Sequence, residues 1–390
     1  MDENANSMSE IQILFTISAI IFLSPYIAKI IKIPVSPTEI MLGIIAGNLG
    51  FLEHNQLFET VSTVGFYYLM FLAGTEVNLK IFFTFDNKIL KKTIIFFVIL
   101  YILSTILAII LNLNPIFAIA IPAMSIGLLS TLYKDYGKEQ IWLNTAMFVG
   151  IVGEIISIAI LTIGKIYFEN GLSLDMFLKI FALCVFLFSA TLVFKGLETL
   201  FWWYPNLKTI IMPKYDKNEK DIRFATAILF LVVGFVLVLD LEIIIGAFIA
   251  GTFIPTFFEY KKDLPQKLSN FGFGFLVPIF FIYTGSIVDI KLIFMPEVIY
   301  IMLLIVTAMF SFRYIASFMF LKILNLKNTT LLFLSLSMPL TLLIAIATIG
   351  YNAKNISEEI YNAFVLASLC EAVISMILIR IVYNFNKNLK

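Results

Sequence analysis

An acidic side chain, Glu154, lies near the middle of the apolar segment FVGIVGEIISIAIL. An ionisable group at the centre of a bilayer costs roughly 2.5–3.5 kcal/mol, so such residues usually have a function. Burial favours the neutral form of a carboxyl group and a nearby cation favours its ionised form, so a balanced carboxylate can hold a proton or a small cation. We expect Glu154 to bind a proton and a metal cation in turn; the alternative is an acid that serves packing only, by pairing with a helix end.

Two further ionisable residues are predicted to compensate charge. Arg313 lies in the apolar stretch TAMFSFRYIASF, and its guanidinium effectively never loses its proton. It must therefore meet an anion or carbonyl oxygens, and the deep acids are Glu154 and Glu371. Glu371, in ASLCEAVISM, could bind Arg313 or neutralise the positive end of a half-helix.

Hydroxyl groups near Glu154 could complete a cation site, because hard cations prefer oxygen ligands. The candidates for ion binding are Ser125, Thr131 and Ser157, with Thr341 from the second half of the chain. Hydroxyls in membrane helices more often bond the preceding turn, so this second interpretation stays open.

The composition predicts that these residues are surrounded by lipid. Of the 390 residues, 61% are apolar and 14% are charged, and the mean hydropathy is +0.99. Soluble domains have about a quarter charged residues. A soluble enzyme is therefore excluded for the whole chain, and a net charge of +1 gives no basic surface for nucleic acid. With the single His54 and two separated cysteines, we expect no resident cofactor or metal cluster.

Thirteen apolar segments predict an all-α membrane protein with about 13 transmembrane helices. Most approach the ~20 residues that a helix needs to cross the hydrocarbon core. Backbone amides in lipid must be paired within the segment, which favours helices over strands. The segments are 10–32, 36–51, 60–79, 92–112, 115–133, 141–166, 174–203, 222–239, 242–257, 270–289, 297–322, 329–350 and 358–385.

The sequence contains an inverted repeat. A constant offset of 217 residues aligns Pro122 with Pro339 and Glu154 with Glu371, and TEIMLGIIAG (38–47) resembles LEIIIGAFIAG (241–251). Each match joins segments seven apart, so the two copies have opposite orientations in the bilayer. Inverted repeats are typical of secondary transporters, in which Gly- or Pro-interrupted helices mark the binding site.

The repeat predicts two discontinuous helices that cross at mid-membrane. The expected breaks are at Pro122 and Gly127 in the first half, and at Pro339 and Gly350 in the second. The alternative is that these residues only kink two packed helices.

The distribution of basic residues predicts the orientation, because basic loops stay in the cytoplasm. With the N-terminus outside and the C-terminus cytoplasmic, 21 of the 27 Lys and Arg lie on the inner side and 4 on the outer side. The acidic N-terminus does not resemble a cleaved signal peptide. We expect a multi-pass protein of the cell inner membrane.

The segments LGIIAG, LMFLAGTEVNLK, GAFIAG and VPIFFIYTGSIVDIK resemble the monovalent cation:proton antiporter family 2, of the Kef and Nap type. The resemblance implies the sodium/proton antiporter fold and a homodimer. Dimerisation-domain helices would lie in 1–91 and 222–296, core-domain helices in 92–166 and 297–390, and a linker helix with a cytoplasmic loop in 167–221.

Two departures from the family pattern fall at the implied site. The family's Thr-Ser-x-Gly stretch matches Met124-Ser125-Ile126-Gly127, with Met in place of Thr. The family's Asn-Asp or Asp-Asp pair matches Gly153-Glu154, so the first polar partner is missing. The family's membrane-embedded Lys or Arg falls on Arg313.

These observations predict an antiporter that exchanges Na+ or K+ for H+ by alternating access, with Glu154 as the shared carboxylate. Two alternatives stay open: a cation channel or regulated K+ efflux pathway on the same scaffold, and an organic-anion symporter. Two acids and one arginine at the same depth favour a cation over an anion. The sequence does not distinguish Na+ from K+ or Li+.

Overall fold

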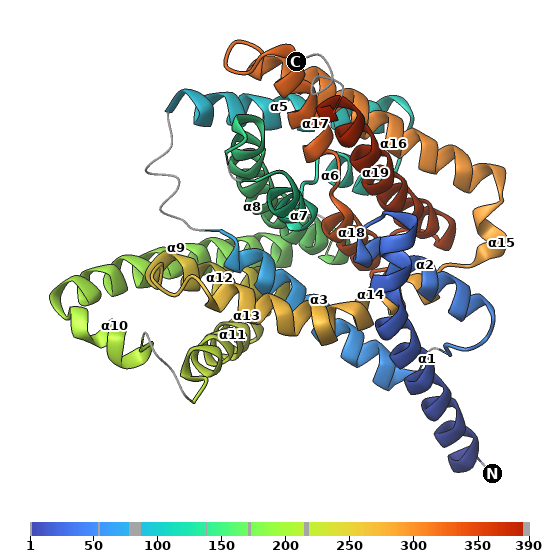
Figure 1. Cartoon of the computed structure of the whole chain (residues 1–390), viewed down its shortest axis with the longest axis horizontal. Coiled ribbons are helices and arrows are strands. Elements are labelled where there is room, and N and C mark those ends of the chain that lie inside the picture. The colour runs from blue at the N-terminus through green and yellow to red at the C-terminus, as the bar shows by residue number, and fades with distance from the viewer. Residues whose placement is uncertain are drawn as a thin grey trace. The chain divides into compact units, whose positions relative to one another are not determined.

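The computed structural model describes residues 2–53, 55–77, 87–137, 139–170, 173–213 and 218–384. All regular structure in these ranges is helical (Figure 1). The predictions for His54 and for part of the basic loop residues lie outside the described ranges; these basic residues are Lys80, Lys138, Lys214, Lys217, Lys387 and Lys390.

Within the residues that the structure describes, ten helical spans are long and apolar enough to cross a membrane. Eight of them centre on one helix each: α1 (Asp2–Ile31), α3 (Gln56–Thr75), α5 (Asn87–Ile110), α8 (Ile141–Asn170), α9 (Leu174–Trp203), α11 (Lys220–Val238), α16 (Pro296–Ser317) and α19 (Glu358–Asn384). The other two are composite: α13 (Leu264–Phe271), the π-helix η1 (Gly272–Leu276) and α14 (Val277–Ser286) form one, and α17 (Leu326–Leu336) and α18 (Leu340–Asn352) form the other.

Shorter helices account for the remaining predicted segments. These are α2 (Val35–Asn48), α12 (Ile243–Phe257) and the interrupted pair α6 (Ile116–Ala120) and α7 (Gly127–Tyr136). The connections include α10 (Pro205–Ile211), α15 (Ile290–Ile293) and the 3₁₀ turn η2 (Phe318–Phe320). Each of the thirteen predicted segments thus corresponds to a helix or a broken helix in the described ranges, and the all-α prediction is confirmed.

The exposed surface of these helices is strongly apolar. In α9 only 11% of the most apolar stretch is buried, and Phe177, Phe181 and Phe188 are each more than 60% exposed. In contrast, 83% of the corresponding stretch in the α17–α18 span is buried. Apolar side chains exposed on this scale are stable only in lipid, so the chain is a multi-pass membrane protein.

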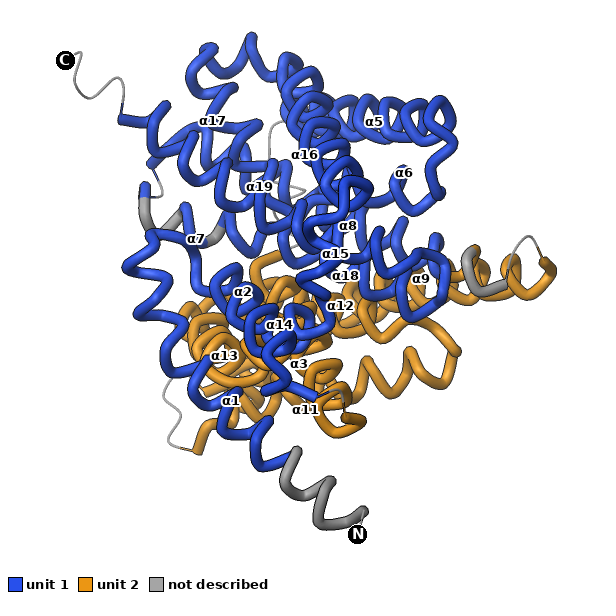
Figure 2. The backbone as a smooth tube through the Cα atoms, turned by 90° about the vertical axis from the view of Figure 1, so that its right-hand side faces the viewer, with its two compact units in different colours: residues 1–53, 85–165, 282–390 blue, residues 54–84, 166–281 orange. Residues whose placement is uncertain are grey.

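The chain forms two compact units, which Figure 2 distinguishes by colour. Unit 1 consists of residues 1–53, 85–165 and 282–390, and unit 2 of residues 54–84 and 166–281. Unit 1 contains most of both segments expected in the core domain, together with the first two helices. The division into dimerisation and core domains stays a prediction.

Glycines allow two pairs of helices to approach closely. In unit 1, a Cβ on Gly43 would lie 2.4 Å from the Ile282 carbonyl oxygen, at the end of α14. In unit 2, a Cβ on Gly251 would lie 2.1 Å from the Phe71 carbonyl oxygen of α3. Helix α2 of the first repeat thus packs on α14 of the second, and α12 of the second packs on α3 of the first. The repeat detected in the sequence is therefore also present in the packing.

Candidate functional site

The first discontinuous helix is interrupted over residues 121–126, between α6 and α7. Pro122 lies inside this unwound segment, where its missing N–H breaks no helical hydrogen bond. Gly127 is the first residue of α7, and its N–H lies 3.4 Å from the Ser125 hydroxyl oxygen, which accepts from it. The structure thus places both residues at the break, as the spacing predicts.

The second discontinuous helix is interrupted over residues 337–339, between α17 and α18. Pro339 immediately precedes α18, so it also lies at a break. The prediction for Gly350 is wrong, because this residue lies inside α18. A Cβ at Gly350 would lie 2.3 Å from Cδ1 of Ile116, so this glycine allows close packing of α18 on α6.

The two broken helices meet at a pair of hydroxyl groups. The Ser125 and Thr341 hydroxyl oxygens are 2.5 Å apart and share a hydrogen bond. Thr341 lies in the first turn of α18, so the bond joins the first break to the start of the second half-helix. Both side chains are at least nine-tenths buried, which protects this contact from bulk water.

Glu154 on α8 faces the first break. Its side chain is fully buried, and its Oε2 accepts a hydrogen bond of 3.3 Å from the Ile126 N–H. One turn further along α8, the Ser157 hydroxyl accepts a bond of 3.2 Å from the Met124 N–H. Helix α8 therefore supplies acceptors for two backbone amides that the unwound segment leaves outside regular helix.

Two glycines on α8 allow this close contact. A Cβ on Gly153 would lie 2.4 Å from Cζ of Phe97 and 3.0 Å from Cβ of Met124. A Cβ on Gly150 would lie 2.8 Å from Cδ1 of Leu129, on the first turn of α7. The two departures from the family pattern, Met124 and Gly153, are thus neighbours in space, and Met124 occupies volume that a side chain at position 153 would need.

Arg313 on α16 binds the carbonyl side of the same break. The side chain is fully buried, and its Nη2 donates a hydrogen bond of 2.6 Å to the Ala123 carbonyl oxygen. Glu371 on α19 is also fully buried, and its charge attracts that of Arg313. Arg313 thus forms a hydrogen bond with a carbonyl oxygen and a longer-range electrostatic interaction with a carboxylate.

The remaining predicted ligand, Thr131, forms its hydrogen bond within its own helix. Thr131 lies in α7, and its hydroxyl donates to the Leu128 carbonyl oxygen at 2.7 Å, within its own helix. This is the bond to the preceding turn that the sequence left open as an alternative.

Sequence reasoning missed several residues of the site. Ala123 and Ile126 contribute backbone atoms, which no side-chain pattern reveals. The Tyr101 hydroxyl on α5 faces Ser157 and Arg313, but a tyrosine within an apolar segment gives no specific indication. Gly150, three residues before Gly153, was detectable as a second small residue on the same helix face.

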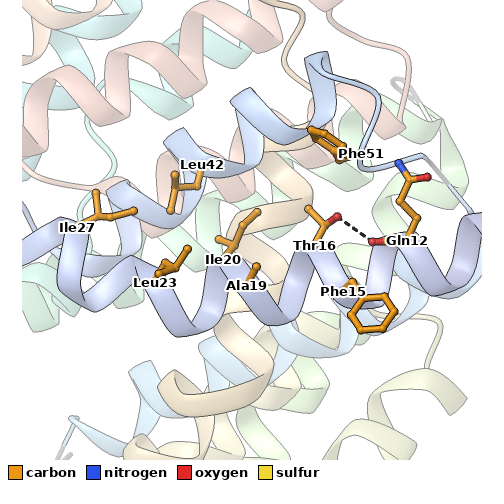
Figure 3. A pocket seen from close by; sticks show the side chains of 9 residues that line it. All are labelled: Gln12, Phe15, Thr16, Ala19, Ile20, Leu23, Ile27, Leu42 and Phe51. Carbon is orange, nitrogen blue, oxygen red and sulfur yellow. Dashed lines mark hydrogen bonds between the residues drawn. The ribbon is translucent and has the colours of Figure 1, made fainter.

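A separate groove of about 480 Å³ runs along α1 and α2 (Figure 3). Its lining is mostly apolar, and its two polar side chains are Gln12 and Thr16. The Gln12 amide donates to the Gly50 carbonyl oxygen, and the Thr16 hydroxyl donates to the Gln12 carbonyl oxygen. This lining contains no carboxylate and suits apolar groups rather than a cation.

Comparisons with known proteins show which family this chain resembles. A family model described as sodium/hydrogen exchanger, transmembrane, matches residues 18–384. A Bacillus subtilis protein assigned as the Na+/H+ antiporter YjbQ is 26% identical over 404 residues; the match covers 95% of this chain but 62% of that protein, so the chain spans less than two thirds of that relative. A Methanocaldococcus jannaschii protein assigned as Na+/H+ antiporter 3 is 24% identical, over 95% of this chain and 96% of that protein.

A solved structure shows the same fold. The sodium proton antiporter MjNhaP1 from Methanocaldococcus jannaschii superposes with a TM-score of 0.66 at 16% sequence identity. The superposition covers 95% of this chain and 98% of that chain. The likeness thus extends over nearly the whole length of both chains.

Proposed function

Because the chain belongs to the sodium/hydrogen exchanger family, we propose that it exchanges a monovalent cation, Na+ or K+, for H+ across the membrane. The observation that supports this most directly is the buried Glu154 carboxylate, hydrogen-bonded to the unwound backbone of a broken helix. The names of the relatives support cation/proton exchange, and the resemblance in the sequence favours the Kef and Nap type within it.

In this proposal Glu154 binds its two cargoes in competition. When Glu154 is ionised, its oxygens and the hydroxyls of Ser125 and Ser157 provide hard oxygen ligands beside the break. When Glu154 is protonated, the cation loses its charged ligand. Cation and proton cannot occupy the carboxylate together, so one leaves as the other binds, and the exchange needs no cofactor.

Arg313 stabilises the break in both loaded states. Its permanent charge lies against the Ala123 carbonyl oxygen, where the end of a half-helix has a partial negative charge. Removal of the guanidinium would leave this carbonyl without its donor and would remove the positive charge that attracts Glu371.

Alternating access, a homodimer, an outside N-terminus and an inner-membrane location complete the proposal. The imbalance of basic residues supports the orientation, because 21 of the 27 Lys and Arg lie on the proposed cytoplasmic side. The implied domain division supports a mobile core that turns the site toward one side at a time.

Substitution of the carboxylate tests the function. In proteoliposomes with a trapped pH-sensitive dye, addition of NaCl or KCl should move protons in wild type, and Glu154→Gln should abolish this exchange. Glu59→Gln is a matched control, because Glu59 is an exposed carboxylate at the start of α3. Full activity in Glu154→Gln would refute the assignment.

A second measurement separates an exchanger from a channel. A proton gradient should drive cation uptake against the cation's own gradient if the two fluxes are coupled. Cation flux that only ever runs down its own gradient would favour the channel alternative.

A further inference from the structure

A second carboxylate, Glu371, is fully buried on α19 and interacts electrostatically with Arg313. Both Glu371 oxygens are buried and lack a hydrogen-bond partner among the described residues. The same holds for Nε and Nη1 of Arg313, whose Nη2 binds Ala123. A buried charged group without hydrogen bonds is costly, so an ionised Glu371 depends on the Arg313 charge for its stability.

Among the described residues of unit 1, three charged side chains are fully buried: Glu154, Arg313 and Glu371. With both acids ionised, their charges sum to minus one. Because net charge is unfavourable in a buried site of low dielectric, the uptake of one positive charge is favoured and the uptake of a second is not.

A short backbone segment, residues 123–126, links Glu154 to Arg313, and Arg313 in turn interacts with Glu371. Arg313 holds the carbonyl of Ala123, and Glu154 accepts from the N–H of Ile126, three residues later. A change in the charge of Glu154 therefore acts on the segment that Arg313 binds, and Arg313 in turn faces Glu371.

Other charged or titratable groups on the neighbouring elements are less buried than these three. The Lys327 ammonium on α17 donates to the Tyr383 carbonyl oxygen, and Tyr351 on α18 contacts the Tyr361 ring. The groups on the helices packed against α19 are Lys291 on α15, Glu297, Tyr300, Arg313 and Tyr314 on α16, Lys327 on α17 and Tyr351 on α18. Of these, Arg313 alone is fully buried.

We propose that Glu371 is a second carboxyl that accepts a proton in the buried group of Glu154, Arg313 and Glu371, which we call the centre. Together with Arg313, Glu371 limits the centre to binding one positive charge at a time. That charge is either a proton, shared between Glu371 and Glu154, or a monovalent cation at Glu154. This inference rests on the proposed exchange function, and it makes the exchange one-for-one and electroneutral.

The charge of the centre can be changed in both directions. Glu371→Gln makes the centre neutral when Glu154 is ionised, so both cargoes should bind more weakly. We expect the apparent KM for Na+ at alkaline pH to rise about tenfold and the pH profile of exchange to move toward acid by about one unit. Arg313→Gln makes the centre more negative and should move the profile toward alkaline pH.

The double variant Glu371→Gln/Arg313→Gln restores a charge of minus one and should return the pH profile and the KM toward wild type. Glu371→Asp keeps the carboxylate and should retain the wild-type profile. A purely structural Glu371 would lower the amount of folded protein or the maximal rate without moving the pH profile, and the double variant would keep the profile of Arg313→Gln.

The outcomes separate the two proposals. An unchanged KM and pH profile in Glu371→Gln overturns the role of Glu371 and leaves the exchange function intact. If Glu371→Gln cannot be purified, the absence of an alkaline shift in Arg313→Gln overturns it instead. No exchange by wild type with either Na+ or K+ contradicts the proposed function itself.

Discussion

The two interrupted helices are related by the repeat but are held in different ways. The first break, residues 121–126, is bound by side chains from three other helices, α8, α16 and α18. The second break, residues 337–339, bonds mainly within its own helix: Ser337 donates through its N–H to Leu334 and through its hydroxyl to Phe333. Ser375 on α19 adds one bond to the Ser337 carbonyl oxygen, at 3.1 Å.

The difference extends to the paired acids. Glu154 accepts a hydrogen bond from its break, whereas its repeat mate Glu371 has no hydrogen-bond partner among the described residues. The repeat thus supplies a common frame of two broken helices and two buried acids. The longer break, with amides available to an acid, is where we place the cation site.

Among the substitutions that compare the two halves, the largest loss of exchange activity should come from Gly153, because its repeat mate in the second half is not a glycine. Gly153→Ala places a methyl group against Phe97 and Met124, and overpacking of this kind costs about 1–3 kcal/mol. Because α8 would be displaced from the break, exchange should fall at least about tenfold and the thermal midpoint in detergent should drop.

The repeat mate of Gly153 is Cys370, which provides the control. Cys370 already has a side chain and is partly exposed, so Cys370→Ser should leave both measurements near wild type. Equal losses in the two variants would show that the halves are packed alike and would contradict the comparison.

An intermediate effect is expected from the hydroxyls that hold each break. Ser157→Ala leaves the buried Met124 N–H without its acceptor, at a cost of about 1–3 kcal/mol. Ser375→Ala removes one donor from a carbonyl oxygen, a loss that buried carbonyls tolerate better. Ser157→Ala should therefore lower the thermal midpoint and the exchange rate more than Ser375→Ala. A larger loss in Ser375→Ala would show that the second break depends more on side chains of other helices than the first, and would contradict the comparison.

The smallest effect is expected at the contact between the two broken helices. In a double-mutant cycle, Ser125→Ala and Thr341→Val should show a coupling of about 1 kcal/mol in thermal stability, because each loses the same hydrogen bond. Thr131→Val should show no coupling with Thr341→Val, since Thr131 bonds its own helix. Coupling at Thr131 would mean that α7 is oriented differently around the site.

The sequence predicted the parts of the site whose residue types are rare in membrane helices. Glu154, Arg313 and Glu371 are ionisable, and Pro122 and Pro339 cannot continue a helical ladder, so each could be recognised from its chemistry alone. The thirteen segments followed from the length of the apolar runs.

The role of a residue could not be predicted from its type where that type commonly serves two purposes. Gly350 was predicted at a break and lies in a packed helix, because glycine serves both purposes and only the position of Ile116 distinguishes them. Ser157 and Thr131 are both hydroxyl residues near the site, and the face of the helix decides that one meets the break and the other bonds its own turn. Ala123 and Ile126 act through backbone atoms that every residue has.

The exchange of partners between the repeats has a consequence for biosynthesis. Helix α2 packs through Gly43 on α14, which is translated about 240 residues later. Helix α3 likewise packs on α12, which is also translated after it. The first half of the chain therefore cannot complete these two helix contacts until the second half has been translated. Two fragments divided in the loop between α10 and α11 should each be degraded when made alone, and should assemble when the cell makes both.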